Sequence, residues 1–248
     1  MKTKKQKQRV LFGFLLVVLS VFFYLLHFAV FRDAHHIFIY LVGDIAFVFI
    51  EVLLVTLIIH QLLSEREKRS MLKKLNMVIG AFFSEVGMAL LKYFWAFDAE
   101  AESFGRHLVI DNDWSPEHFD KMEEILHDRE FKIDIHKGDL EQLRSFLIGK
   151  RVFLLRLLEN PNLLEHDEFT ELLWAVFHLA EELSHRKTTS GLPETDYTHL
   201  AGDIKRAYGL LVREWLSYME HLKASYPYLF SLAVRTNPFN PEASVEVK

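Results

Sequence analysis

Two long apolar runs dominate the N-terminal part of the chain. They cover residues 10–31 and residues 37–63, and only the polar sequence RDAHH separates them. A helix rises ~1.5 Å per residue, so about 20 apolar residues cross the ~30 Å hydrocarbon core of a bilayer. Because the polar connection has room only for a tight turn, the pattern predicts a transmembrane hairpin over residues 10–63.

Basic residues flank this hairpin on both sides. Residues 1–9, MKTKKQKQR, carry five positive charges, and the segment SEREKRSMLKK after the second run is again rich in Lys and Arg. A signal peptide has an apolar core of only ~7–15 residues that ends at small residues. The first run is longer and ends in Phe31 and Arg32. The sequence therefore predicts that the first apolar run is not cleaved off. It predicts a multi-pass protein of the cytoplasmic membrane with both termini in the cytosol.

A third apolar segment, residues 75–97, is interrupted by Glu85 near its middle and by Lys92. These charges offset most of the free energy gained by inserting the segment into a bilayer. We therefore expect residues 64–97 to form a basic linker and a helix that lies at, or just beneath, the cytoplasmic membrane surface. A third membrane span is the alternative, and it would place the C-terminal domain outside the cell.

Residues 98–235 have the amphipathic spacing of a helical bundle. Three of the four predicted helix starts have a side chain that can accept hydrogen bonds from first-turn amides. These residues are Ser115, Asp139 and Asn162, the last paired with Glu165. The predicted helices cover about 115–128, 139–159, 162–185 and 196–225. Four helices that each need a partner for one apolar stripe predict an antiparallel bundle, and thus an all-α membrane protein.

The last predicted helix carries apolar side chains at alternating spacings of four and three, which is a heptad seam. The seam consists of Ile204, Tyr208, Leu211, Trp215, Tyr218 and Leu222. Residues 131–136 alternate like a short strand, and with the short apolar run 107–110 they could form a minimal sheet at most. Residues 236–248 carry no helix signal, so we expect an extended and exposed tail.

Charge divides the chain near residue 97. Residues 1–97 have a formal charge of +6, whereas residues 98–248 have −11. An acidic domain is repelled by phosphate backbones, so we expect a basic protein partner and no nucleic acid. The sequence contains no cysteine, which excludes disulfides, thiolate nucleophiles and Cys-ligated metal clusters.

Two carboxylates lie inside the second apolar run. Asp44 and Glu51 are seven residues apart, so a rotation of ~100° per residue places them on nearly the same helix face. A charge in hydrocarbon is costly unless it is paired, protonated or facing water. One interpretation is a cation pathway in an assembly of hairpins, with His27 and His60 adding pH sensitivity. The other is that both carboxylates form hydrogen bonds across helices and hold an oligomer together.

Two Glu-x-x-His pairs, Glu124/His127 and Glu182/His185, are candidate metal ligands, because di-iron carboxylate bundles use this spacing. Conceivable partners on other helices are Glu85 and Glu159. The apolar spacing of both helices turns the two pairs away from the core, so we expect no buried di-metal site and no cofactor. P-loop, nucleophile-elbow and HExxH motifs do not occur, so no enzyme is predicted.

These patterns lead to one functional prediction and two alternatives. The prediction is a non-enzymatic protein whose hairpin lies in the lipid bilayer and oligomerises an acidic cytosolic bundle, which docks a protein partner or scaffolds an assembly. The first alternative is an oligomeric cation channel or transport subunit lined by Asp44 and Glu51. The second alternative is a metal-dependent enzyme built on the helical bundle.

Overall fold

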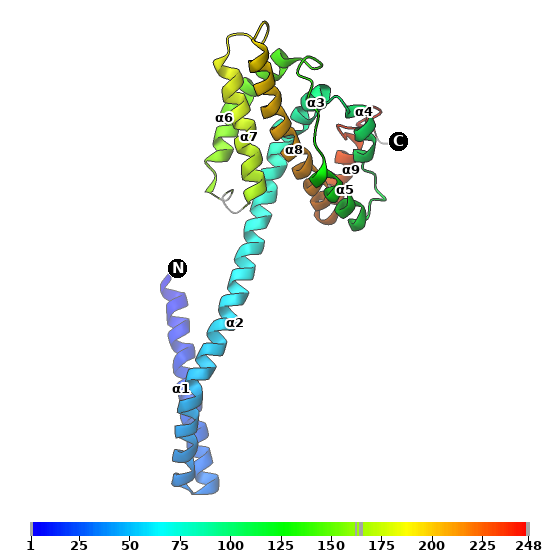
Figure 1. Cartoon of the computed structure of the whole chain (residues 1–248). Helices are drawn as coiled ribbons and strands as arrows, with labels where there is room; N and C mark the ends of the chain where they lie inside the picture. Colours follow the sequence, from blue (N-terminus) through cyan, green and yellow to red (C-terminus); the bar gives the residue numbers. More distant parts are fainter. Residues whose placement is uncertain (1, 162, 164–165, 247–248) are drawn as a thin grey trace. The chain divides into compact units, whose positions relative to one another are not determined.

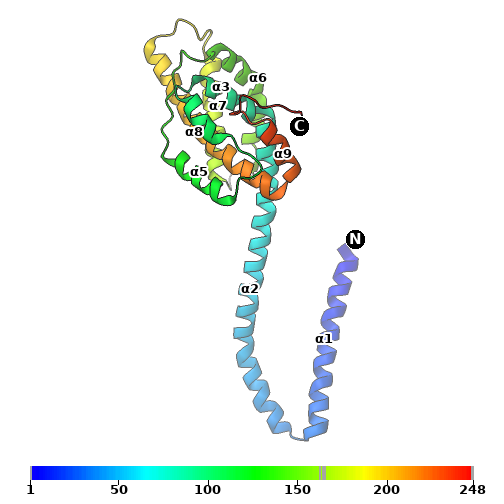
Figure 2. The ribbon, with the colours of Figure 1, turned by 90° about the vertical axis from the view of Figure 1, so that its right-hand side faces the viewer.

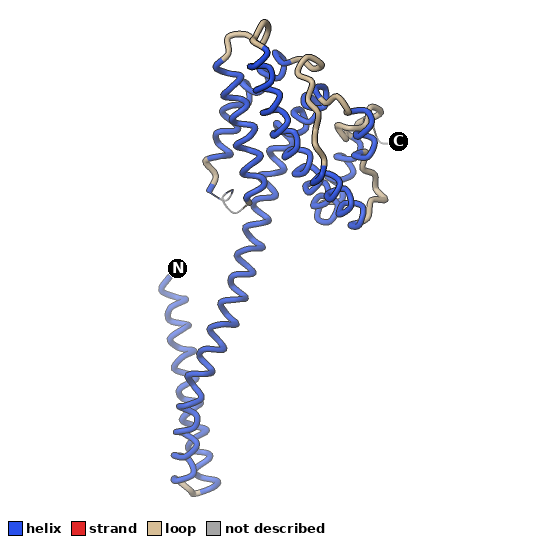
Figure 3. Tube along the Cα trace, viewed as in Figure 1, coloured by secondary structure: helices blue, strands red, loops and turns tan. Residues whose placement is uncertain are grey.

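The computed structural model describes residues 2–161, 163 and 166–246. These residues are mostly helical, and no strand occurs among them. Figure 3 shows that helices joined by loops account for the described chain. Contacts divide the protein into two compact units, residues 1–68 and residues 69–248. The two units are described separately below.

The first unit is a helical hairpin. α1 (Lys2–Phe31) and the first part of α2 (Ala34–Phe82) run antiparallel (Figure 1). Only Arg32 and Asp33 separate the two helices, and Arg32 adopts a positive φ of 52° to make the turn. Asp33 Oδ1 accepts a hydrogen bond from the His36 backbone N–H at 3.1 Å and thereby caps the start of α2. The turn is therefore shorter than the predicted five residues.

The side chains of the hairpin are almost entirely exposed. Between residues 11 and 65 only His27, Ile37 and Leu41 are half-buried. The other large apolar side chains of this stretch keep between 42% of their surface exposed, at Tyr24, and 75%, at Phe49. A soluble monomer rarely exposes an apolar surface this continuous. The hairpin therefore needs an apolar environment or other protein surfaces around it.

The second unit is a helical bundle centred on its longest helix, α8, which contacts α3, α5, α7 and α9 (Figure 2). Two short non-α helical segments interrupt the chain between α2 and α5. The remaining elements are η1 (Phe83–Gly87), α3 (Met88–Phe97), α4 (Ala101–Gly105), η2 (Arg106–Leu108), α5 (Pro116–Asp128), α6 (Leu140–Leu158), α7 (Asp167–His185), α8 (Glu194–Ser225) and α9 (Pro227–Arg235).

The third apolar segment, residues 75–97, contributes to the core of this bundle. The ring of Phe82 contacts the ring of Phe169 on α7 at 5.4 Å between centroids. Glu85, the charge near the middle of the segment, is exposed and pairs with Lys150 on α6 at 3.0 Å. The buried apolar residues are Leu75, Ile79, Phe82, Phe83, Val86, Leu90, Leu91, Phe94 and Phe97. The bundle thus begins earlier than the predicted boundary at residue 98, because helices α7 and α8 cover this apolar stripe.

The heptad seam agrees with the sequence pattern, as do the helix starts at Ser115 and Asp139, whereas α7 begins later than the predicted start at residue 162. Asp139 Oδ1 accepts from the Gln142 backbone N–H at 2.9 Å, and the Ser115 backbone N–H donates to His118 Nδ1 at 3.0 Å. Five of the six seam residues on α8 are buried, and Tyr218 is half-buried. α7 begins at Asp167, after its N-cap His166. The predicted capping pair Asn162 and Glu165 lies outside the described residues.

The two predicted short strands do not form. Residues 106–108 are the short helix η2. Within the segment 131–136, Ile133 forms one isolated antiparallel bridge, and its partner is Asp98. One bridge fastens a loop to the end of α3 without creating a sheet.

The prediction of an exposed tail after residue 235 was wrong for its first part. Asn237 and Phe239 are buried, with 1% and 2% of their surfaces exposed. Asn237 Nδ2 donates to the Leu108 carbonyl oxygen at 2.9 Å. The Phe239 ring lies 5.2 Å from the Trp95 ring and 4.9 Å from the Trp215 ring. These aromatic contacts hold the tail against the bundle.

Candidate functional site

The predicted intramembrane polar residues all lie in the hairpin. Asp44, Glu51 and His60 on α2 are exposed, and His27 on α1 is half-buried. The His27 ring stacks 5.8 Å from the ring of His36, across the turn. Among the described residues, neither Asp44 nor Glu51 has a hydrogen-bond or ion-pair partner. The two carboxylates thus stay available for a neighbouring helix or for water.

The two Glu-x-x-His pairs are not brought together. Glu124 and His127 are exposed on α5, as the sequence predicts. His185 is exposed at the end of α7, where its Nδ1–H donates to the Glu181 carbonyl oxygen at 2.7 Å. Glu182 has a different environment, because it lies beside histidines that the pair pattern does not include.

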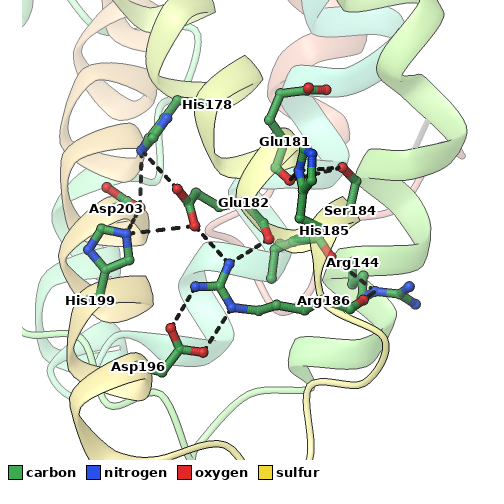
Figure 4. Close-up of polar contacts among 11 residues, drawn as sticks. Arg144, His178, Glu181, Glu182, Ser184, His185, Arg186, Asp196, His199 and Asp203 are labelled. Carbon is green, nitrogen blue, oxygen red and sulfur yellow. Dashed lines mark hydrogen bonds and ion pairs between the residues drawn. The ribbon is translucent and has the colours of Figure 1, made fainter.

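Four side chains meet between α7 and α8, and we call them the α7–α8 cluster (Figure 4). They are His178 and Glu182 on α7, and His199 and Asp203 on α8. Residues four apart lie on one face of a helix, one turn from each other. Each helix therefore presents one histidine and one carboxylate to its neighbour.

Asp203 is the most buried member of the α7–α8 cluster. Its side chain is 4% exposed, and Oδ2 lies 3.5 Å from His178 Nε2 and 3.4 Å from His199 Nε2. Asp203 Oδ2 is buried and has no hydrogen-bond partner among the described residues. Burying an unsatisfied carboxylate oxygen is costly. The arrangement therefore needs positive charge at the point that both imidazoles face.

Arg186 forms hydrogen bonds that hold Glu182 of the cluster in place. Its Nε and Nη2 donate to the two carboxylate oxygens of Asp196 at 2.9 and 2.6 Å, and its Nη1 donates to Glu182 Oε2 at 2.8 Å. The hydrogen bonds from this guanidinium hold the pKa of Glu182 and the pKa of Asp196 below their usual values. Glu182 is therefore a fixed, ionised carboxylate at neutral pH.

The sequence analysis did not identify His178, His199 or Asp203. The available signal was a pair of His-x-x-x-acid spacings, one on each helix beside the same loop. The Glu-x-x-His spacing paired Glu182 with His185, whereas in the structure Glu182 lies beside His178 and His199. A second signal was the position of Asp203, a carboxylate directly before Ile204, the first residue of the heptad seam.

A separate groove of about 610 Å³ lies among the end of α2, η1, α8 and α9. At its polar end, Asn76 Nδ2 donates to His221 Nδ1 at 3.2 Å. Burial lowers the pKa of the His221 imidazole, which favours its neutral form. No Asp, Glu, Lys or Arg lines this groove among the described residues. It therefore lacks the charged ligand set that the α7–α8 cluster has.

The two units together define a class of protein: an all-helical chain with an exposed apolar hairpin followed by a helical bundle. The chain belongs to the MJ1433 family. The family model described as "MJ1433, N-terminal helical domain" matches residues 3–63, and the one described as "Uncharacterized protein MJ1433, C-terminal helical domain" matches residues 71–235.

A curated relative supports this membership. Uncharacterized protein MJ1433 of Methanocaldococcus jannaschii is 46% identical to the chain over 230 residues, which cover 93% of this chain and 92% of the relative. No solved structure matches the chain. The likeness extends over both the hairpin and the bundle.

Proposed function

We propose that this protein is a membrane-anchored docking or scaffolding protein without catalytic activity of its own. In this proposal α1 and the first part of α2 cross the cytoplasmic membrane, and the helical bundle works in the cytosol. The exposed apolar hairpin is the observation that carries the proposal. Its two apolar helical stretches, Leu11–Phe31 and Ala34–Glu65, have 21 and 32 residues and are long enough to cross a membrane by length and composition.

Burial distinguishes these two stretches from the third apolar helix. In Leu11–Phe31 and in Ala34–Glu65, no residue of the most apolar part of the helix is buried. In Lys74–Phe97, some residues of the most apolar part are buried. Apolar area gains about 25 cal/mol per Å² when it leaves water. Lipid can supply that gain for the hairpin, while the bundle core already supplies it for much of the third helix. This contrast favours two spans, with both chain ends in the cytosol.

The surface of α5 supports a basic partner for the bundle. The carboxylates exposed on this helix are Glu117, Asp120, Glu123, Glu124 and Asp128. Burial raises the pKa of nearby Glu220 on α8, and the negative charges of Asp120 and Glu123 raise it further. Repulsion among these carboxylates would be relieved by a partner that brings Lys or Arg side chains.

A cation channel or transport subunit is the second candidate. Asp44 and Glu51 support it, because they share one face of an apolar helix and have no partner among the described residues of a single chain. Only an assembly of hairpins could enclose a pore. In the leading proposal the same two carboxylates form hydrogen bonds between hairpins and stabilise the oligomer.

Cysteine labelling tests the membrane proposal directly, since the chain has no cysteine of its own. Ala34→Cys places a thiol at the start of α2, next to the turn, and Ser231→Cys places one at an exposed position of α9. In intact cells a membrane-impermeant maleimide should label Ala34→Cys but not Ser231→Cys, and permeabilisation should expose both. The protein should also stay in the membrane pellet after alkaline washing. Release by that wash would refute the anchor, and reversed labelling would refute the orientation.

Docking is tested by cross-linking in cells. The variant Asp120→Asn/Glu124→Gln should lose a cross-linked partner that the native chain captures, because it removes two charges from α5. Glu159→Gln is the control, since Glu159 is equally exposed but lies at the end of α6. A partner retained by the α5 variant would show that the acidic face is not the docking surface.

A further inference from the structure

The donor atoms of the α7–α8 cluster are two imidazole nitrogens and carboxylate oxygens. Among biological cations, zinc and similar divalent transition metals accept this mixed set of nitrogen and oxygen ligands. One ligand atom from each of His178, Glu182 and His199 lies within 4.8 Å of the other two. Asp203 adds a fourth ligand beside both histidines. We propose that His178, Glu182, His199 and Asp203 bind one divalent transition-metal ion of the zinc class.

The distances around Asp203 match a tetrahedral site. In such a site, bonds of ~2.0–2.1 Å to the metal place the ligand atoms about 3.3–3.4 Å apart. Asp203 Oδ2 lies 3.5 Å from His178 Nε2 and 3.4 Å from His199 Nε2. Asp203 Oδ2 therefore lies at ligand spacing from both imidazole nitrogens.

Glu182 completes the set after a small movement. Its Oε1 lies 4.0 Å from His178 Nε2, and its Oε2 lies 3.8 Å from His199 Nε2. An approach of Oε1 by about 0.6 Å gives the spacing from His178 Nε2 that a tetrahedral site requires. Arg186 occupies Oε2 through its hydrogen bond, which leaves Oε1 as the ligand.

The burial of the Asp203 carboxylate, together with the missing hydrogen bond of its Oδ2 in the described part of the chain, independently indicates a bound cation. The Asp203 side chain is 4% exposed, and its Oδ2 lies beside both imidazole nitrogens but has no hydrogen-bond partner among the described residues. The nearest permanent cation is Arg206, whose Nη2 lies 3.7 Å from the other oxygen, Oδ1. A metal ion bound beside the two imidazoles would supply the charge that Oδ2 lacks.

The bound ion would join two helices. His178 and Glu182 belong to α7, while His199 and Asp203 belong to α8, and the two helices are connected by the loop that contains Gly191. Each helix supplies a nitrogen and an oxygen, so neither helix can hold the ion alone. Binding therefore stabilises the contact between α7 and α8.

The experiment uses the full chain in detergent, purified without a polyhistidine tag and stripped with a chelator. We expect isothermal titration with zinc chloride to give one saturable equivalent per chain and a higher thermal unfolding midpoint. Titration with cobalt chloride should give the intense visible absorption of a tetrahedral site. Weak, non-saturable zinc binding, or a cobalt spectrum typical of six-coordinate surface binding, would overturn the proposal.

Variants locate the ion. The double variant His178→Gln/His199→Gln changes two half-exposed rings, and it should fold and bind zinc at least tenfold more weakly. Asp203→Asn should have a similar effect, provided that circular dichroism shows a folded bundle. The matched control is His185→Gln, since His185 is an exposed histidine on the same helix that lies outside the cluster. Unchanged affinity in the double variant, or an equal loss in the control, would refute the assignment.

A salt bridge network is the competing explanation. In that case the two imidazoles only pair with Asp203, and the double variant loses stability without any effect of zinc on the native chain. That outcome would also overturn the metal site.

Discussion

The indole ring of Trp95 occupies the space beside Gly105: a Cβ atom on Gly105 would lie 1.5 Å from Trp95 Cη2. Gly105 has an ordinary helical φ of −60°, so backbone strain does not require glycine here. Close approach requires it, because α4 packs directly on the tryptophan of α3. The same indole contacts Phe239, so Trp95 links α3, α4 and the C-terminal segment.

Gly105→Ala should therefore destabilise the bundle. Overpacking of a well-packed site costs about 1–3 kcal/mol, and we expect the upper part of that range because the clash involves the large, half-buried ring of Trp95. The control is Gly202→Ala on α8, where a Cβ meets nothing within 4 Å. It should stabilise the helix by about 0.5–1 kcal/mol. Denaturant unfolding followed by tryptophan fluorescence measures both, and equal stability of the two variants would contradict the prediction.

Phe239→Ala tests whether the C-terminal segment is part of the folded bundle. The ring is 2% exposed and lies between Trp95 and Trp215, so its loss should cost about 3–5 kcal/mol. Tryptophan emission should shift to longer wavelength as water reaches the two indoles. Val245→Ala is the control, since Val245 is 66% exposed. If thermal unfolding and emission are the same in both variants, the tail does not pack as described.

Glu214 should make the stability of the bundle depend on pH. Burial raises the pKa of this carboxyl from 4.5 to about 7, and the charge of Glu168 adds to the effect. The folded state thus holds the proton more tightly than the unfolded state. The stability from the neutral form is complete below pH 4.5 and is lost as the pH rises to about 7.

The variant Glu214→Gln keeps the neutral form at every pH. One pKa unit corresponds to about 1.4 kcal/mol, so the variant should be about 2–3 kcal/mol more stable than the native chain at pH 8. At pH 4.5 the two should differ little. Glu171→Gln, which alters an exposed carboxylate on α7, should change the free energy of unfolding by less than about 0.5 kcal/mol at both pH values. A pH-independent effect of Glu214→Gln would refute the raised pKa.

Local signals made the helices of the bundle predictable. The cap at Asp139 and the seam from Ile204 to Leu222 depend on residues within one helix, so the sequence contains the whole pattern. Residues 75–97 were harder to place, because an apolar stripe that fits a bundle core also fits a membrane interface. Contacts with residues far away in the sequence, such as that of Phe82 with Phe169, distinguish the two.

The α7–α8 cluster was unpredictable for a related reason. Each His-x-x-x-acid pair can be found within its own helix, but which pairs face each other depends on the register of α7 against α8. Burial of Asp203 sets that register beside His178, and no local pattern contains it. The packed tail is a similar case, because Phe239 is buried only through its contacts with Trp95 and Trp215.

The final prediction concerns the carboxylates of the hairpin. If Asp44 and Glu51 form hydrogen bonds between hairpins, the variant Asp44→Asn/Glu51→Gln should weaken self-association. A bond between membrane helices contributes ~0.6 kcal/mol, which is about a threefold change in the association constant for each bond lost. Native mass spectrometry of protein released from lipid nanodiscs measures the subunit number. Glu65→Gln is the control, since Glu65 lies on α2 just beyond the apolar run.

Potassium flux in proteoliposomes is the second measurement, and we expect none from the native chain. Flux that is present in the native chain, lost in the double variant and kept in Glu65→Gln would instead establish the channel, because only a water-filled pathway needs both carboxylates for conduction.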